Sequence, residues 1–296
     1  MFIVKWVAGF LAGVLAVVAT GCTAPAASQS PSVIVVANYP LEYLASRLAP
    51  FAQVVNLTPP GTEPHDLELS AQQVQSISTA AVVVYTKGFQ PAVDQAIATA
   101  APKVVADASY GIELAPLTDT PSSQLDPHLW LDPTQYDRMA DNVAAAIIKA
   151  FPDKDTAVAD ALAKLSGDLD QLDGDINMGL STCAIRTFVT THAAFGYLAK
   201  RYELTQVAID GLDPTTEPSA AWLAEVQGLI VENKVSTVFV EPLASPAAAD
   251  QIARDLGLTT DMLDPIEGIT SASRGSDYFT IMRANLTALK TANGCS

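Results

Sequence analysis

The sequence has few positive charges and very few cysteines and histidines. Sixteen Lys and Arg residues face 32 Asp and Glu residues, which gives a formal net charge of −16. Binding to nucleic acid requires a basic surface, so this balance excludes a nucleic-acid partner. Because the 296 residues include only three cysteines and three histidines, a site built from either residue type must use most of them.

The N-terminal residues predict export from the cytoplasm. Residues 1–21 read as a secretory signal, with an apolar core too short for a membrane span. The following "ATGC" resembles the cleavage box of bacterial lipoproteins, in which Cys22 becomes lipid-modified. Ala19 stands where a larger aliphatic residue is commoner, so a plain secretory signal remains an alternative. Residues 22–32 are small and polar and predict a flexible linker.

The other two cysteines, Cys183 and Cys295, predict a disulfide. An exported protein meets an oxidising compartment, where an even pair of cysteines is a candidate for a bridge. Such a bridge would join the end of the chain to the start of its second half. Two free buried thiols are the alternative.

Short Val-rich runs alternate with helical segments through the rest of the chain. With 49% apolar residues, the chain can bury large cores. Buried runs separated by helices predict parallel strands. We therefore expect an α/β fold of two similar doubly wound lobes, at 33–150 and 182–296, each with a four-stranded, mainly parallel sheet. The predicted strands lie at 33–38, 53–59, 81–86, 103–109, 187–191, 205–210, 236–242 and 259–265.

The two lobes are predicted to be joined by one long helix, within residues 151–181. Apolar residues recur there every three or four positions and form one stripe. A helix of this length spans about 40 Å, enough to run across both lobes. Gly167 and Gly174 weaken this prediction.

All three histidines fall beyond the predicted carboxyl ends of strands, the edge where open α/β sheets bind ligands. His65 and His128 lie in loops of the first lobe, and His192 directly follows a strand of the second. Asp264 ends the last strand, before Pro265. Each of these residues alone has an ordinary explanation as a surface or turn residue. Together they predict one site in the cleft between the lobes.

Three imidazoles and a carboxylate form a ligand set that suits zinc, which binds nitrogen and oxygen donors in a tetrahedral arrangement. Catalytic zinc keeps one position open for water. Four protein ligands close the coordination sphere, so the set favours holding the ion over using it in a reaction.

Five segments resemble the zinc/manganese-binding lipoproteins of bacterial ABC transporters, a group of solute-binding proteins. They are "PPGTEPHDLELS", "DPHLWLDP", "THAAFGYLAKRY", "VFVEP" and "LDPIEG", and the resemblance runs from about Val33 to the C-terminus. It implies two lobes joined by one long helix. It also implies that His65, His128, His192 and Asp264 are the metal ligands.

The resemblance also bears on selectivity and on the residues around the ligands. Manganese-preferring members often carry glutamate where His192 stands, so an imidazole there favours zinc. Ligating histidines usually donate their second N–H to a carboxylate. Glu241 matches a recurrent acidic position of the family and is the first candidate for this role. Asp126, Asp132 and Glu63 are further candidates, with turn capping as the alternative. The His-rich loop of some zinc-binding members is absent before His128.

The implied function is a high-affinity zinc receptor, not an enzyme. It would sit lipid-anchored at the outer face of the cell membrane, as a monomer, and deliver zinc to a permease driven by a cytoplasmic ATPase. A metallochaperone is a further candidate partner. A manganese or iron receptor is the main alternative. A zinc hydrolase with Glu241 or Asp264 as the base is a remote one, and no residue pattern bears on an adhesin role. Because zinc needs neutral imidazoles, affinity should fall with pH through the histidine range.

Overall fold

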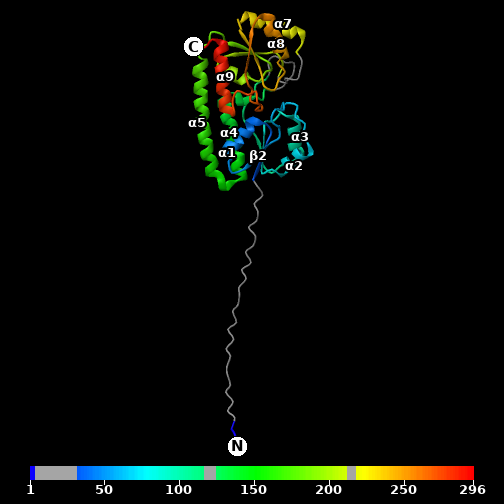
Figure 1. Ribbon diagram of the computed structural model, residues 1–296, viewed down its shortest axis with the longest axis vertical. Coiled ribbons are helices and arrows are strands. Elements are labelled where there is room, and N and C mark those ends of the chain that lie inside the picture. Colours follow the sequence, from blue (N-terminus) through cyan, green and yellow to red (C-terminus); the bar gives the residue numbers. More distant parts are fainter. Residues whose placement is uncertain (4–31, 117–124, 212–217) are drawn as a thin grey trace. The chain divides into compact units, whose positions relative to one another are not determined.

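The computed structural model describes residues 1–3, 32–116, 125–211 and 218–296 (Figure 1). Residues 31–296 form one compact unit, separate from residues 1–30. Cys22, nearly all of the predicted signal and nearly all of the linker lie outside the described residues. In the described parts of the chain, no helix combines the length and the apolar character needed to cross a membrane.

The first sheet contains four parallel strands in the order β2-β1-β3-β4. The central strands are buried at Ile34–Val36 of β1 and Val82–Val84 of β3, because both faces of the sheet carry helices, and this explains the aliphatic residues there. Figure 1 places α1 and α4 on one side and α2 and α3 on the other. The elements are β1 (Val33–Val36), α1 (Tyr39–Leu48), β2 (Gln53–Asn56), α2 (Ala71–Thr79), β3 (Val82–Tyr85), α3 (Pro91–Ala100) and β4 (Val105–Asp107).

The second sheet repeats this arrangement, with parallel strands in the order β6-β5-β7-β8. Two sheets with the same strand order confirm the predicted α/β fold with two similar doubly wound lobes. In this topology the carboxyl ends of the strands form the ligand-binding edge. The elements are β5 (Thr187–Thr190), α6 (Gly196–Arg201), β6 (Thr205–Ala208), α7 (Ala220–Glu232), β7 (Thr237–Val240), α8 (Ala247–Leu256) and β8 (Thr259–Met262).

Helix α5 (Asp155–Leu180) lies where the connecting helix was predicted. Its 26 residues span about 39 Å, and Gly167 and Gly174 do not interrupt it. It packs against α1 and α4 of the first lobe and against α9 (Tyr278–Asn293) of the second. Figure 1 shows α5 running along the side of both lobes. The apolar stripe is buried at Val158, Leu165, Leu169, Leu172 and Ile176, and its remaining member, Leu162, is partly covered.

Polar contacts fix α5 to each lobe in turn. Arg47 of α1 pairs with Asp168 at 2.6 Å, and Arg201 of α6 pairs with Asp173 at 2.7 Å. These ion pairs are partly exposed, and such pairs contribute about 0–1 kcal/mol each. The buried apolar stripe of α5 therefore supplies most of its attachment, and the ion pairs fix its register.

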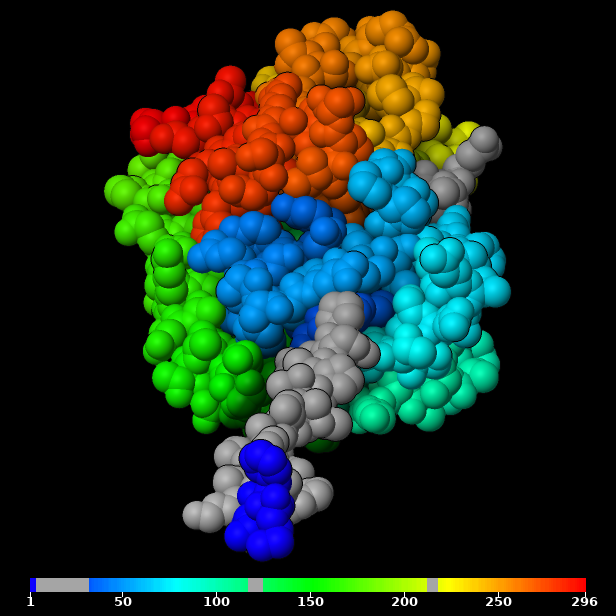
Figure 2. Space-filling model, turned by 60° about the horizontal axis from the view of Figure 1, so that its bottom comes forward, coloured from blue at the N-terminus to red at the C-terminus, as the bar shows by residue number. Residues whose placement is uncertain are grey.

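Two further helices, α4 of the first lobe and α9 of the second, were not predicted from the sequence pattern. Helix α4 (Pro133–Ala150) begins at Asp132, whose side chain accepts a hydrogen bond from the Thr134 amide. Helix α9 starts with a capping box formed by Asp277 and Thr280. The start of α9 contacts α1, with the rings of Tyr43 and Phe279 6.0 Å apart. Figure 2 shows this contact as orange-red residues lying against blue ones, so the two lobes touch along this face.

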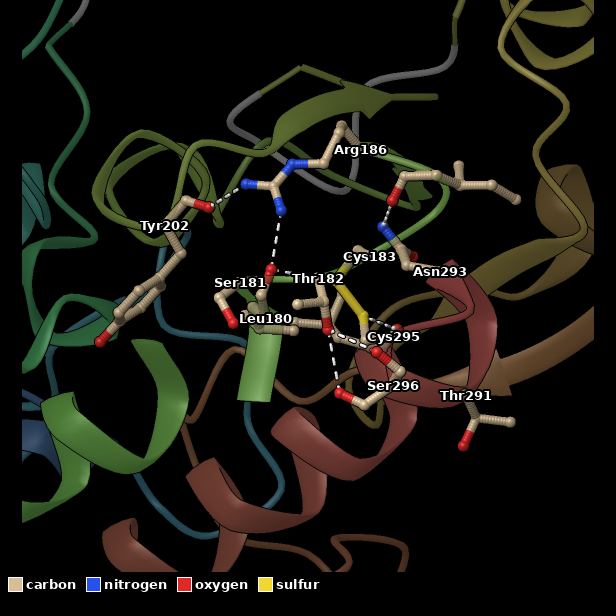
Figure 3. The surroundings of a disulfide bond; sticks show 12 residues. Leu180, Ser181, Thr182, Cys183, Arg186, Tyr202, Thr291, Asn293, Cys295 and Ser296 are labelled. Atoms are coloured by element: carbon tan, nitrogen blue, oxygen red, sulfur yellow. Dashed lines mark hydrogen bonds between the residues drawn. A yellow bond between two sulfur atoms is a disulfide. The ribbon is translucent and has the colours of Figure 1, made fainter. Parts of the chain in front are cut away.

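The predicted disulfide between Cys183 and Cys295 is present (Figure 3). It joins the segment after α5 to the segment after α9, across 112 residues. Hydrogen bonds reinforce the junction: Arg186 donates to the Leu180 carbonyl at 2.7 Å, and Asn293 donates to the Ile185 carbonyl at 2.9 Å. The bridge therefore ties the connecting helix to the end of the chain.

We expect the double substitution Cys183→Ser and Cys295→Ser to lower the free energy of unfolding by about 4 kcal/mol, because a bridge across so long a loop restricts the unfolded chain. Urea unfolding of both proteins measures this difference. A reductant should weaken the wild-type protein to the level of the variant and leave the variant unchanged. Equal stability of the two oxidised proteins would contradict the prediction.

Candidate metal site

Four side chains from both lobes meet beyond the carboxyl edges of the sheets. His65 follows β2, His128 directly precedes the short helix η1 (Leu129–Leu131), and His192 comes two residues after β5. Glu267 follows β8. One donor atom from each of the four lies within 4.8 Å of the others. The structure thus brings together the three predicted histidines, with a carboxylate that the sequence analysis did not name.

The three imidazoles point their Nε2 atoms at one oxygen of Glu267. The distances to Glu267 Oε1 are 2.9 Å from His65, 3.0 Å from His128 and 3.6 Å from His192. His192 Nε2 is buried and has no hydrogen-bond partner among the described residues. A buried nitrogen lone pair that faces two other imidazoles and a carboxylate is well placed to bind a metal ion.

The cluster is closed off from solvent on most sides. The side chains of His128, His192 and Glu267 are at most 2% exposed, whereas His65 is 10% exposed. The ring of Phe89 meets His65 edge-on at 4.6 Å, and Trp130 lies 5.2 Å from His128. His65 is therefore the most accessible of the four candidate ligands.

Asp126 orients the ring of His128. Its Oδ1 atom accepts hydrogen bonds from His128 Nδ1 at 2.8 Å and from the His128 amide at 2.9 Å. A proton held on Nδ1 leaves the lone pair of Nε2 available for a metal ion. Asp126 thus lies where the sequence analysis expected an orienting carboxylate.

Glu241, which directly follows β7, orients the ring of His192 in the same way. It accepts from His192 Nδ1, from the His192 amide at 3.0 Å and from the Thr191 hydroxyl at 2.5 Å. Three donors fix this carboxylate, so it fixes the imidazole in turn. Two of the three histidines therefore have a carboxylate on Nδ1 and direct Nε2 at the centre of the cluster.

The other two candidate orienting carboxylates behave differently. Asp132 accepts hydrogen bonds from the Thr134 amide and hydroxyl, at 2.9 and 2.7 Å, and so caps α4. This is the capping role that the sequence analysis gave as the alternative. Glu63 accepts from the His65 amide at 3.0 Å and keeps its second oxygen 4.0 Å from His65 Nε2. Glu63 therefore fixes the backbone of the His65 loop.

Asp264, the predicted fourth ligand, is not one of the four clustered residues. Its Oδ1 atom accepts from the Ile266 amide at 2.8 Å, and Asn285 is bound to its main chain on both sides. Ile266 adopts the left-handed conformation, with φ of 61°, which β-branched residues rarely take. Asp264 thus stabilises a tight turn, and this turn delivers Glu267 to the histidines.

Burial and neighbouring charges shift several pKa values in the cluster. Burial disfavours the charged form of Glu267, but hydrogen bonds and charges of the histidines outweigh it and hold the pKa well below its usual range. Burial likewise opposes protonation of His128, but Asp126 and Glu267 raise its pKa above 6.5. For His192, Glu241 and Glu267 outweigh burial and raise the pKa further. Burial raises the pKa of Asp264 to about 6.

Known proteins resemble this chain over most of its length. A family described as zinc-uptake complex component A, periplasmic, matches residues 34–292. The zinc-binding lipoprotein AdcA of Streptococcus pneumoniae R6 is 32% identical over 303 residues, which cover 97% of this chain and 60% of AdcA. The high-affinity zinc uptake system protein ZnuA of Bacillus subtilis is 31% identical over 275 residues, 87% of this chain and 86% of that protein. The chain therefore spans only part of the length of AdcA.

Solved structures share the fold. The Zn(II)-bound ZnuA-like domain of S. pneumoniae AdcA superposes with a TM-score of 0.77 at 34% identity, covering 89% of this chain and 99% of that one. The laminin-binding protein Lmb of Streptococcus agalactiae, described as bifunctional with adhesin and metal transporting activity, gives a TM-score of 0.82 at 28% identity and the same coverage. The matches are to binding components of metal uptake systems, not to enzymes. The chain belongs to the ZnuA family, the periplasmic A components of zinc-uptake complexes.

Proposed function

We propose that this protein binds a single zinc ion as cargo at His65, His128, His192 and Glu267 and delivers it to a zinc importer. The observation that carries this proposal is the convergence of three Nε2 atoms on one buried carboxylate oxygen. The names of the relatives, zinc-binding lipoprotein and zinc uptake protein, agree with it.

The chemistry of the donors favours zinc over harder ions. Three imidazole nitrogens and one carboxylate oxygen suit a borderline ion in a tetrahedral site, whereas manganese prefers more oxygen donors. Four protein donors close the coordination sphere, which suits capture and release. Glu241, the candidate base of a hydrolase, already accepts three hydrogen bonds beside His192 and serves to hold that ring.

We further propose that Cys22 carries a lipid anchor, and that the partners are a membrane permease and its ATPase. The family description as a component of an uptake complex and the lipoprotein names of relatives support this arrangement. The mature protein would then hold zinc outside the membrane, next to the permease.

The first test is the metal content of the purified protein lacking residues 1–22. We expect one zinc per chain, retained against excess manganese, because the nitrogen-rich donor set favours zinc. Elemental analysis followed by competition titration of the apo-protein measures both quantities. Preferential binding of manganese or iron would keep the site and overturn its selectivity, and no uptake of any metal would overturn the proposed function.

The identity of the fourth ligand is tested by two matched substitutions. Glu267→Gln removes the charged donor and should weaken zinc binding by about 100-fold or more, beyond the loss typical of residues that only support a ligand. Asp264→Asn should weaken it by clearly less than Glu267→Gln does, because Asp264 acts only through the turn that carries Glu267. Chelator competition gives both affinities. A larger loss from Asp264→Asn than from Glu267→Gln would restore Asp264 as the ligand.

Zinc affinity should depend on pH. An imidazole must release its proton before Nε2 binds zinc, and the pKa values of His128 and His192 in the metal-free protein lie above 6.5. Affinity is therefore full above these pKa values and declines as the pH falls through them, beginning above pH 6.5. Chelator competition from about pH 8 to pH 5.5 measures the decline. An affinity that stays flat over this range would contradict a three-histidine site.

A further inference from the structure

We propose that the first turn of helix α6, Gly196 and Tyr197 in the second lobe, positions the metal ligand His128 of the first lobe. This inference rests on the proposed function, because it assigns a role in zinc binding to residues that do not touch the ion. Both act through Asp126, the carboxylate that holds the His128 ring.

Tyr197 fixes the main chain on which Asp126 stands. Its hydroxyl donates to the Asp126 carbonyl at 2.9 Å and accepts from the Ala115 amide at 2.8 Å. Ala115 and Asp126 are also bonded to each other, because the Asp126 amide donates to the Ala115 carbonyl at 2.9 Å. The Tyr197 hydroxyl thus bonds to two adjacent backbone segments of the other lobe and holds both in register with α6.

Gly196 allows the Asp126 carboxylate to lie directly against α6. A Cβ atom at position 196 would stand 2.8 Å from Asp126 Oδ2, closer than side chains pack. The other oxygen of Asp126 accepts from His128 Nδ1 at 2.8 Å. A connected path therefore runs from α6 through Asp126 to the ring nitrogen opposite the metal-binding one.

An anchor from outside the loop is needed because Asp126 and His128 are only two residues apart. A pair this close in sequence can rotate together with its loop, so Asp126 alone cannot define where His128 Nε2 points. Tyr197 and Gly196 follow the ligand His192 by only a few residues. This short segment therefore sets the distance between two ligands that belong to different lobes.

A second set of hydrogen bonds holds the chain on the other side of His128, at Trp130. The Trp130 indole donates to the Pro265 carbonyl at 2.7 Å, two residues before Glu267, and the Tyr278 hydroxyl donates to the Trp130 carbonyl at 2.7 Å. The His128 loop is therefore held from both sides by the lobe that carries His192 and Glu267. With Trp130 in place, removal of the Tyr197 hydroxyl should loosen the loop without releasing it.

The test compares Tyr197→Phe with Tyr202→Phe. Each removes one hydroxyl, and the Tyr202 hydroxyl donates to Asp173 of α5 at 3.0 Å; among the described residues it makes no hydrogen bond to Asp126 or His128. Zinc affinity is measured by chelator competition, and cobalt(II) substituted for zinc reports ligand geometry through its visible absorption. We expect Tyr197→Phe to weaken zinc binding about 10-fold, as loss of an orienting residue does, and to alter the cobalt spectrum. Tyr202→Phe should retain the wild-type affinity and spectrum.

Gly196→Ala provides an independent check, since the added methyl group displaces the Asp126 carboxylate while the Tyr197 hydroxyl remains. It should alter the cobalt spectrum in the same way. If wild-type protein binds zinc but Tyr197→Phe keeps its affinity and cobalt spectrum, the positioning role is wrong and the proposed function stands. Equal losses in Tyr197→Phe and Tyr202→Phe would also overturn the role, because they would mean general destabilisation. If the wild-type protein binds neither metal, the proposed function itself fails.

Discussion

The rest of the site depends on one constraint. The negative charge of Glu267 is buried, so neighbouring groups must balance it. An isolated buried carboxylate is destabilising by several kcal/mol, so its charge must be balanced within the protein. His65 and His128 contact it, and His192 lies 3.6 Å away. The histidines supply this balance: Asp126 and Glu267 raise the pKa of His128, and Glu241 and Glu267 raise the pKa of His192, which favours protonated rings beside the carboxylate. A zinc ion bound as proposed would replace those protons at the same ligand atoms, which links binding to pH.

The fold supplies this cluster by repeating one arrangement twice. Both sheets have the same strand order, and their carboxyl edges carry the loops with the four donors. The orienting carboxylates come from the same loop in one case, Asp126, and from the neighbouring strand in the other, Glu241. Helix α5 packs against α4 of the first lobe and α9 of the second, and the Cys183–Cys295 bridge joins the segments that follow α5 and α9. The two lobes are therefore held in register by the packing of whole helices.

The fourth residue of the cluster, Glu267, could not be identified from the local sequence pattern. In the sequence, Asp264 ends a predicted strand before a proline, and this pattern is what a ligand at a sheet edge would have. The chain instead uses Asp264 to bind the Ile266 amide and continues through a left-handed residue to Glu267. The local sequence pattern does not show which of Asp264 and Glu267 is the ligand, because both lie in the loop that follows β8. Their distance from the histidines depends on one backbone turn. The liganding roles themselves stay predictions until metal binding is measured.

The sequence by itself determined the parallel α/β lobes, the long connecting helix, the cysteine pair and the grouping of three histidines at one edge. The lobes and the helix follow from short-range periodicity, and the cysteine pair and the histidine grouping follow from the small number of these residues. Both properties can be read directly from a sequence. Only the tertiary structure decided that Glu267 completes the cluster and that Tyr197 holds the His128 loop. The contacts of Glu267 join residues 139 and 202 positions apart. Such contacts arise from the packing of whole elements against each other, and no spacing within a single segment records them.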